Sequence, residues 1–128
     1  MSYKILQVVE SAYRATIEEQ DDTIVWISHA LKNAEADIHV LLRANAVNYA
    51  VKSQDASGLS FGAWKQTQPA NVAGDVAKLV EKGVSVYVVQ DDLRERGIEA
   101  NEVIQGIKMV SRKDIPGLYD NHDQVWHW

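Results

Sequence analysis

The sequence predicts an α/β domain, a three-layer sandwich in which a five-stranded parallel sheet lies between two layers of helices. Short runs of β-branched and apolar residues alternate along the chain with segments of helical periodicity, which is typical of parallel strands joined by helical crossovers. The strand candidates are apolar at nearly every position, which indicates burial on both faces of a sheet. The length of 128 residues, with 46% hydrophobic and 24% charged side chains, suits a single domain over residues 1–128.

Five segments are predicted to be strands. The three clearest are 5–9, 38–42 and 84–89, in which Val, Ile and Leu dominate. Two weaker candidates lie at 107–110 and at 124–128. The connections between them are long enough for helices, as parallel pairing requires.

Two long helices are predicted between these strands. Thr16-Ile17-Glu18-Glu19 has the pattern of a capping box, so we expect the first helix to run from Thr16 to about Asn33. The second is expected over 71–82, because its apolar residues recur at helical spacing. Gly83 follows where a left-handed C-terminal cap belongs.

Two shorter helices complete the alternation. One is expected at 46–52, directly after the second strand. The other should open at a second capping box, Ser111-Arg112-Lys113-Asp114, and it contains Pro116 early, where proline is tolerated.

Residues 53–68 interrupt this alternation of strands and helices. The segment contains Gly58 and Gly62, which favour turns, and two aromatic residues, Phe61 and Trp64. A loop of this length in a small domain is usually functional, mobile or part of an interface. We therefore expect its aromatic residues to serve either as a lid or as a subunit contact.

The composition excludes several kinds of chemistry. The chain has no cysteine, which rules out disulfides, thiolate metal sites, cysteine nucleophiles and persulfide carriage on its own side chains. With 13 basic and 18 acidic residues the net charge is −5, which argues against nucleic acid as a partner. No apolar run approaches the roughly 20 residues of a membrane helix, and no secretory signal is visible, so a cytoplasmic location is expected.

Motifs of common cofactor sites and catalytic sites are also missing. Neither a phosphate-binding glycine loop nor a nucleophile elbow follows any predicted strand. His122, Asp123 and His127 lie close in sequence but match no standard ligand spacing, so no metal and no cofactor are predicted. Because no nucleophile is paired with a base, the sequence favours a binding protein over an enzyme.

Polar side chains are expected to converge where the parallel strands end, since ligands of such sheets bind beyond the carboxyl ends of the strands. The candidate ligand-binding residues there are Glu10, Arg43, Asn45, Asn48, Tyr49, Gln90 and Asp91. Arg43 and Arg112 would suit a small anion. The structural alternatives are that Asp91 or Asp92 caps the next helix and that the two asparagines occupy turns.

A second set of residues suggests contacts between subunits. Its members are Phe61, Trp64, Arg96, Trp126 and Trp128. Aromatic and arginine side chains are common hot spots of protein interfaces. For Arg96 a structural ion pair is the alternative, with Gly97 ending the preceding helix, and the two C-terminal tryptophans could instead belong to the core.

Three segments resemble proteins of the DsrE/DsrF/DsrH-like family. Residues 83–98, Gly-Val-Ser-Val-Tyr-Val-Val-Gln-Asp-Asp-Leu-Arg-Glu-Arg-Gly-Ile, are similar to the family's strand followed by a D-L-x-x-R-G stretch. Residues 37–51 resemble its second strand and the short helix after it. The tail, 110–128, is similar to the closing helix and tryptophan-ended strand of the DsrH (TusB) branch.

The resemblance implies a flavodoxin-like domain that assembles as trimers or hexamers. It also implies a sulfur-relay setting, in which some subunits carry a persulfide on a cysteine just after the third strand. Gln90 stands near that position here, and an amide cannot form a persulfide.

Three functions follow in order of preference. The first is a non-catalytic, homo-oligomeric binding or scaffold protein linked to sulfur metabolism. The second is a DsrH/TusB-like partner of cysteine-bearing DsrE-like subunits. The third is an enzyme that binds a small anion or a nucleotide through Glu10, Arg43 and Asp91.

Overall fold

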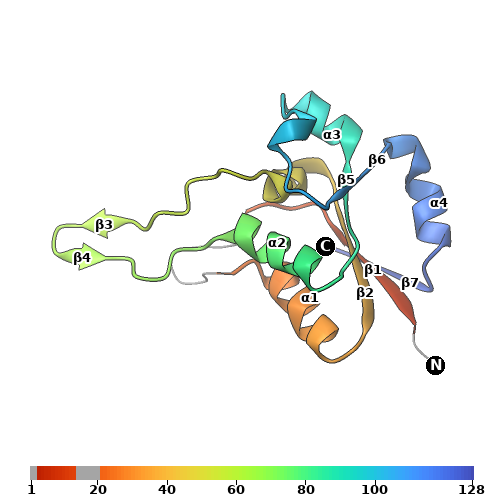
Figure 1. The fold of residues 1–128 in the computed structure, drawn as a ribbon, viewed down its shortest axis with the longest axis horizontal. Coiled ribbons are helices and arrows are strands. Elements are labelled where there is room, and N and C mark those ends of the chain that lie inside the picture. The colour runs from red at the N-terminus through yellow and green to blue at the C-terminus, as the bar shows by residue number, and fades with distance from the viewer. Residues whose placement is uncertain (1–2, 14–20) are drawn as a thin grey trace.

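The computed structural model describes residues 3–13 and 21–128, and a five-stranded sheet forms its centre (Figure 1). The strands are β1 (Lys4–Val9), β2 (Asp37–Leu42), β5 (Val86–Val89), β6 (Lys108–Val110) and β7 (Gln124–His127). Their order is β6-β5-β2-β1-β7, and all neighbouring pairs are parallel. The predicted α/β fold and its five parallel strands are confirmed.

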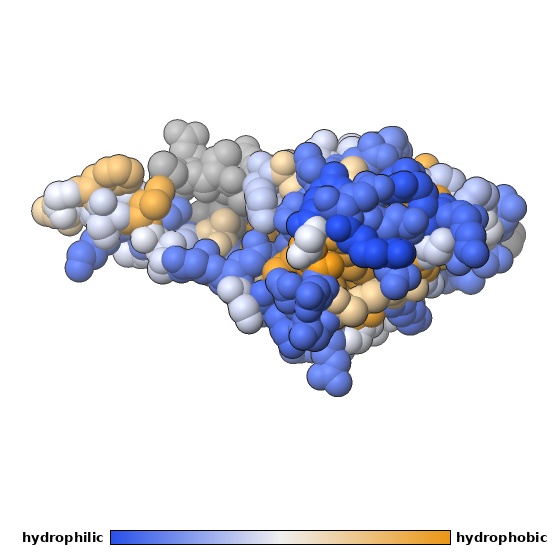
Figure 2. Space-filling view, turned by 90° about the horizontal axis from the view of Figure 1, so that it is seen from above, coloured by the Kyte–Doolittle hydropathy of each residue, from blue (hydrophilic) through white to orange (hydrophobic). Residues whose placement is uncertain are grey.

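Residues 53–68, which we call the arm, form a projecting hairpin. Two short strands, β3 (Ser60–Phe61) and β4 (Trp64–Lys65), pair in antiparallel fashion at its far end. Gly62 in the turn has a φ of +59°, which glycine adopts at little cost. Figure 1 shows the arm reaching away from the sheet, and in Figure 2 hydrophobic atoms gather at the end of the molecule that the arm forms. The sequence predicted a long loop here but no strands.

Helices cover the two faces of the sheet unequally. One face carries α1 (Thr23–Asn33), α2 (Val72–Glu81) and the 3-10 helix η1 (Ala44–Ala50), while α4 (Ile115–Asp120) lies on the other. The helix expected at 46–52 is therefore the 3-10 helix η1. Within residues 3–13 and 21–128, no helix is both long and apolar enough to cross a membrane.

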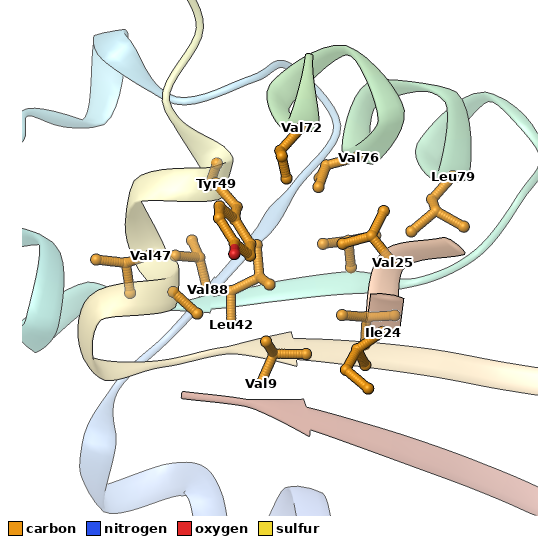
Figure 3. Close-up of a cluster of buried hydrophobic side chains, with 14 of the residues drawn as sticks. Val9, Ile24, Val25, Leu42, Val47, Tyr49, Val72, Val76, Leu79 and Val88 are labelled. Carbon is orange, nitrogen blue, oxygen red and sulfur yellow. The ribbon is translucent and has the colours of Figure 1, made fainter. Parts of the chain in front are cut away.

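Two buried clusters hold these layers together. Alternate residues of a strand point to opposite faces, so Val9 belongs to the larger cluster under α1 and α2, and Val8 belongs to the smaller one under α4. Figure 3 shows the larger cluster; the side chains labelled in it are Val9, Ile24, Val25, Leu42, Val47, Tyr49, Val72, Val76, Leu79 and Val88. Apolar side chains on both faces of the sheet explain why the strand sequences are apolar at nearly every position.

The structure corrects the start of the first helix. α1 begins at Thr23, and the side chain of Asp22 caps it by accepting hydrogen bonds from the N–H groups of Ile24 at 2.9 Å and Val25 at 3.1 Å. Asp22 itself is extended, with ψ 126°, so the helix does not continue back through it. The capping box expected at 16–19 lies outside the described residues.

Other helix ends agree with the sequence. Asn71 caps α2 by accepting from the N–H of Gly74 at 3.0 Å, and Gly83 has the expected positive φ, +89°. Ser111 is the N-cap of the 3-10 helix η3 (Arg112–Asp114), which leads into α4. These caps satisfy backbone donors and acceptors that a helix end leaves unpaired.

The cap of α1 also joins that helix to η1. The hydroxyl of Tyr49 donates a hydrogen bond of 2.6 Å to the second carboxylate oxygen of Asp22. Both residues have 0% of their surface exposed, so the bond is shielded from water. Charge-assisted bonds of this kind are stronger than neutral ones, and breaking a buried one is costly.

We predict that Asp22→Ala lowers the free energy of unfolding by about 2–3 kcal/mol, because the helix loses its cap and Tyr49 loses this acceptor. Urea denaturation followed by circular dichroism measures the change. Asp55→Ala is the matched control, since Asp55 accepts from the N–H of Ser57 in the same way but lies exposed on the arm. An Asp22 variant as stable as the control would contradict this account of the α1–η1 junction.

Candidate functional site

The carboxyl ends of the parallel strands meet at one edge of the sheet, and the polar residues there fall into two groups. The first, which we call the edge cluster, consists of Glu10, Arg43, Tyr119 and His127. Glu10 follows β1, and its Oε1 lies 3.3 Å from Nε of Arg43 and 3.0 Å from Nε2 of His127. A guanidinium N–H of Arg43 also donates to the Tyr119 hydroxyl at 3.4 Å.

The edge cluster occupies the place where ligands of open parallel sheets bind. Glu10 follows β1, Arg43 follows β2 and His127 ends β7, so the cluster lies at the carboxyl ends of three adjacent strands. The carboxylate of Glu10 already neutralises Arg43, and the cluster contains no nucleophile beside a base. It can position a small polar molecule by hydrogen bonds, and an anion would have to displace Glu10 from Arg43.

The second group surrounds Asp92, which lies in the helix α3 (Gln90–Glu95) directly after β5. Asp92 is 5% exposed; one carboxylate oxygen accepts from the N–H of Ala44 at 2.7 Å and the other is bound by the Arg112 guanidinium. Arg112 also donates to Glu95 at 2.9 Å. Asp92 therefore connects the segments that follow β2, β5 and β6.

These contacts set the protonation state of Asp92. Burial alone would raise the pKa of its carboxyl, but the hydrogen bonds from Ala44 and Arg112 outweigh burial and hold the pKa below its usual range. Bonds to Asp92 and Glu95 raise the pKa of Arg112 in turn. Arg112, which the sequence offered for an anion, is engaged within the chain.

The same network corrects the expected role of two aspartates. α3 begins at Gln90, its N-cap residue is Val89, and no side chain caps it. The expectation that Asp91 or Asp92 caps this helix is therefore wrong. Asp91 lies in the first turn and accepts from the N–H of Arg112 at 2.8 Å, a bond that lowers its pKa.

Arg96 and Asn45 form a further contact of this network. Arg96 donates from Nε and Nη2 to the side-chain oxygen of Asn45, at 3.3 and 3.0 Å, and from Nη1 to the carbonyl of Asp92 at 3.1 Å. Gly97 follows with a φ of +69° and ends the helix as predicted. Arg96 therefore bonds within its own chain, and it lies 3.9 Å from the Glu95 carboxylate, which is the structural ion pair given as its alternative. A role of Arg96 in a subunit interface stays a prediction.

The remaining predicted ligand residues lie apart from one another. Asn48 donates its side-chain amide to the carbonyl of Asn45 at 2.8 Å, which is a turn contact. Tyr49 is fully buried under α2, and Gln90 is exposed at the start of α3. The structure therefore brings Glu10 and Arg43 together, but it divides the predicted set between separate places.

A cavity that the sequence did not predict lies at the root of the arm. It has a volume of about 250 Å³, and its lining includes Tyr13, Gln54, Asp55 and Asn71; we call it the Tyr13 pocket. The Tyr13 hydroxyl donates to the side-chain oxygen of Gln54 at 2.9 Å, and its ring meets Tyr49 edge to face at 5.3 Å. Burial raises the pKa of Tyr13, so its phenol stays neutral at pH 7.

One signal could have pointed to this pocket. Tyr13 lies three positions beyond Glu10, in the connection that leaves the first predicted strand, where ligand residues are expected. Gln54 stands at the start of the long loop, and Asn71 stands three positions beyond its last residue. Only the fold shows that these two residues lie next to Tyr13.

The candidate interface residues differ in their surroundings. Trp128 donates its indole N–H to the side-chain oxygen of Gln7 at 2.7 Å, and the buried Gln7 donates to Ser28 at 2.9 Å. Trp128 thus provides a hydrogen-bond donor for the buried side chain of Gln7, although 43% of the surface of Trp128 itself is exposed. Phe61 and Trp64 lie on the arm, 61% and 47% exposed, with ring centroids 5.8 Å apart.

The histidines lie in separate places, and two of them, His39 and His122, contact each other. Nδ1 of His39 lies 2.8 Å from Nε2 of His122, at the end of the sheet opposite the edge cluster, and burial together with His122 lowers the pKa of His39. His127 belongs to the edge cluster instead, so His122, Asp123 and His127 do not share a site. In the part of the chain that the structure describes, no three potential metal ligands come together.

Comparison with known proteins identifies relatives of this fold. The sequence profile of the DsrE/DsrF-like family matches residues 8–127. No protein with a curated description matches the sequence.

Several solved structures are similar over nearly the whole chain. The ychN protein of E. coli has a TM-score of 0.77 and 20% sequence identity, with 100% of both chains covered. A conserved protein of unknown function from Bacteroides thetaiotaomicron has a TM-score of 0.67 and 15% identity, covering 98% of this chain and 95% of its own. A protein of unknown function from Methanobacterium thermoautotrophicum has a TM-score of 0.58 and 15% identity, covering 95% and 96%. At these identities the likeness shows the fold.

We predict that Asp92 makes the protein sensitive to acid. Its folded-state pKa lies below the unfolded value of about 3.9, so its contribution is complete above that value and is lost as the pH falls through the folded pKa. Asp92→Asn should lower the unfolding free energy by about 1–3 kcal/mol at pH 6, and should flatten its decline between about pH 5 and pH 2.

Urea denaturation at a series of pH values measures both effects. The exposed Asp120, at the end of α4, provides the control variant Asp120→Asn. Equal pH slopes for the wild type and Asp92→Asn would show that this carboxylate does not hold the edge of the sheet together.

Proposed function

The chain belongs to the DsrE/DsrF-like family, and from this membership we propose that it is a non-catalytic subunit of a homo-oligomer linked to sulfur metabolism. Its role is to bind a small polar molecule or to serve as a scaffold. The observation that carries this proposal is that a member of this family has no cysteine in 128 residues. A persulfide forms only on a thiol sulfur, so the chain cannot carry one itself.

The polar groups at the sheet edge support binding rather than catalysis. In the edge cluster, Arg43 and His127 both face the carboxylate of Glu10, and none of the four residues is a nucleophile activated by a base. The carboxylate of Asp92 is fully engaged in holding the fold. These arrangements satisfy charges and leave no group poised for a covalent step.

The Tyr13 pocket is the best candidate for a ligand. Its volume of about 250 Å³ lies near the lower end of what small-molecule sites have, so it suits a small molecule. A neutral phenol and the amides of Gln54 and Asn71 offer donors and acceptors without net charge. Among the described residues of its lining Asp55 alone carries a charge, which favours an uncharged or weakly cationic ligand over an anion.

Exposed aromatic residues support self-association. Apolar side chains that are exposed together often mark an interaction surface, and Phe61 and Trp64 lie together on the arm. A trimer or a hexamer is the form that the family resemblance favours.

A second candidate is a DsrH/TusB-like subunit that works with cysteine-bearing relatives. The feature that favours it is the tail, 110–128, which resembles that branch and here forms β6, α4 and β7. In such an assembly the sulfur would travel on a partner's cysteine, and this chain would shape the complex.

Native mass spectrometry of the protein purified from its own host tests the proposal. We expect one species, a trimer or a hexamer of this chain, because the exposed apolar surface is then covered by other copies. Light scattering at micromolar concentration provides an independent mass. A monomer in both measurements would contradict the proposal, and a stable complex with cysteine-bearing subunits would replace it by the second candidate.

A further inference from the structure

The arm carries an exposed apolar end, which we call the arm tip: Leu59, Phe61 and Trp64. These side chains are 46%, 61% and 47% exposed, and residues 57–65 are exposed throughout. The charges of the arm, Asp55 and Lys65, cancel. Leu59, Phe61 and Trp64 therefore form an exposed apolar surface with one positive charge, Lys65, beside it, on a chain whose net charge is −5.

The arm tip is beyond the reach of its own core. An extended strand rises about 3.3 Å per residue, so the stretch from Ser53 to Phe61 spans about 25 Å. The radius of gyration of a domain of this size is only about 14 Å. Figure 1 shows the arm directed outward over this length. A two-stranded hairpin with two residues in each strand is marginal in water without support from another surface.

The same chain offers a receiving surface of matching chemistry, which we call the root groove. It is a cavity of about 310 Å³ between Ala73, Gly74 and Ala77 of α2 and, opposite them, Ile104 and Gln105. Of the lining residues that the structure describes, Lys52 alone carries a charge. A cavity of roughly 150 Å³ accommodates a benzene molecule, so the root groove is large enough for the indole of a tryptophan.

We propose that the arm tip of one copy docks into the root groove of a second copy of this chain. The inference deepens the proposed function, because it rests on the homo-oligomer and assigns the surface that builds it. Both complementary parts occur in each chain, so every copy can give one arm and receive another. One tip buries roughly a few hundred Å² of aromatic surface, less than a stable interface needs, so the arms must be exchanged around a closed assembly.

The docked arm also completes the candidate ligand site. The root groove and the Tyr13 pocket share three lining residues, Gln54, Asn71 and Ala73. An arm tip seated in the groove therefore lies next to the Tyr13 pocket of the copy that receives it. The neighbouring copy becomes part of the wall of that pocket, so ligand binding and assembly are coupled.

The cysteine-free sequence allows a direct test by crosslinking. Ala63→Cys places a thiol in the turn between Phe61 and Trp64, and Gln105→Cys places one at the exposed rim of the root groove. The two single variants are co-expressed and treated with a short bismaleimide, and the joined peptides are identified by mass spectrometry. Docking raises the effective concentration of the thiols to the millimolar range, so we expect at least about tenfold more 63–105 crosslink than in the pair Ala63→Cys and Lys113→Cys.

Matched variants distinguish docking of the arm tip from non-specific association between chains. In the Ala63→Cys chain, adding Trp64→Ser should reduce the crosslink to the control level, and so should Ala77→Glu in the chain that carries Gln105→Cys. Trp26→Ser removes a tryptophan that is 57% exposed on α1 and should leave the crosslink unchanged. Circular dichroism verifies that each variant is folded.

Three results would overturn the inference. In the first, the wild type is oligomeric and the 63–105 crosslink does not exceed the control, which leaves the proposed function in place. In the second, a chain carrying both thiols joins them at monomer mass, which means that the arm folds onto its own groove. In the third, the wild type is a monomer, and the proposed function falls as well.

Discussion

The buried carboxylate of Asp92 joins the connections at the edge of the sheet where the edge cluster lies. Parallel strands bring all their carboxyl ends to one edge, so the connections after β2, β5 and β6 must meet there and satisfy their polar groups. Asp92 does so by accepting from the N–H of Ala44 and from Arg112. The cost of burying the charge of Asp92 is offset by a backbone donor and an opposite charge.

The contacts of Asp92 divide this edge of the sheet into two halves. In one half the polar side chains are bonded within the chain, and in the other they remain partly exposed. On the β5 and β6 side, the side chains of Asp91, Arg96 and Arg112 all form hydrogen bonds within the chain. On the β1 side, Glu10 and His127 remain partly exposed, and the chain beyond β1 places Tyr13 against the root of the arm. Binding capacity therefore lies beside the arm, which is also the surface proposed to meet other copies.

Sequence reasoning succeeded where a signal is local. Runs of valine, isoleucine and leucine predicted β1, β2 and β5, because these strands are largely buried and leave little room for polar residues. The two outer strands, β6 and β7, are more exposed, and they were predicted from weaker patterns. Sequence reasoning failed where a partner is distant in the chain. Asp91 and Asp92 suit a cap by residue type, but the donors that they bind, Arg112 and Ala44, lie far away in the sequence. The strands of the arm were missed because two residues carry no periodicity.

The central claim is that this cysteine-free member of the family assembles with further copies of itself through the arm. A crystal structure of the assembled protein tests that claim most directly. The account predicts that Phe61 and Trp64 of one copy lie between α2 and Ile104 of the next copy, beside that copy's Tyr13 pocket. A lattice in which the arm tip contacts no other copy, or in which only isolated monomers pack, would contradict it.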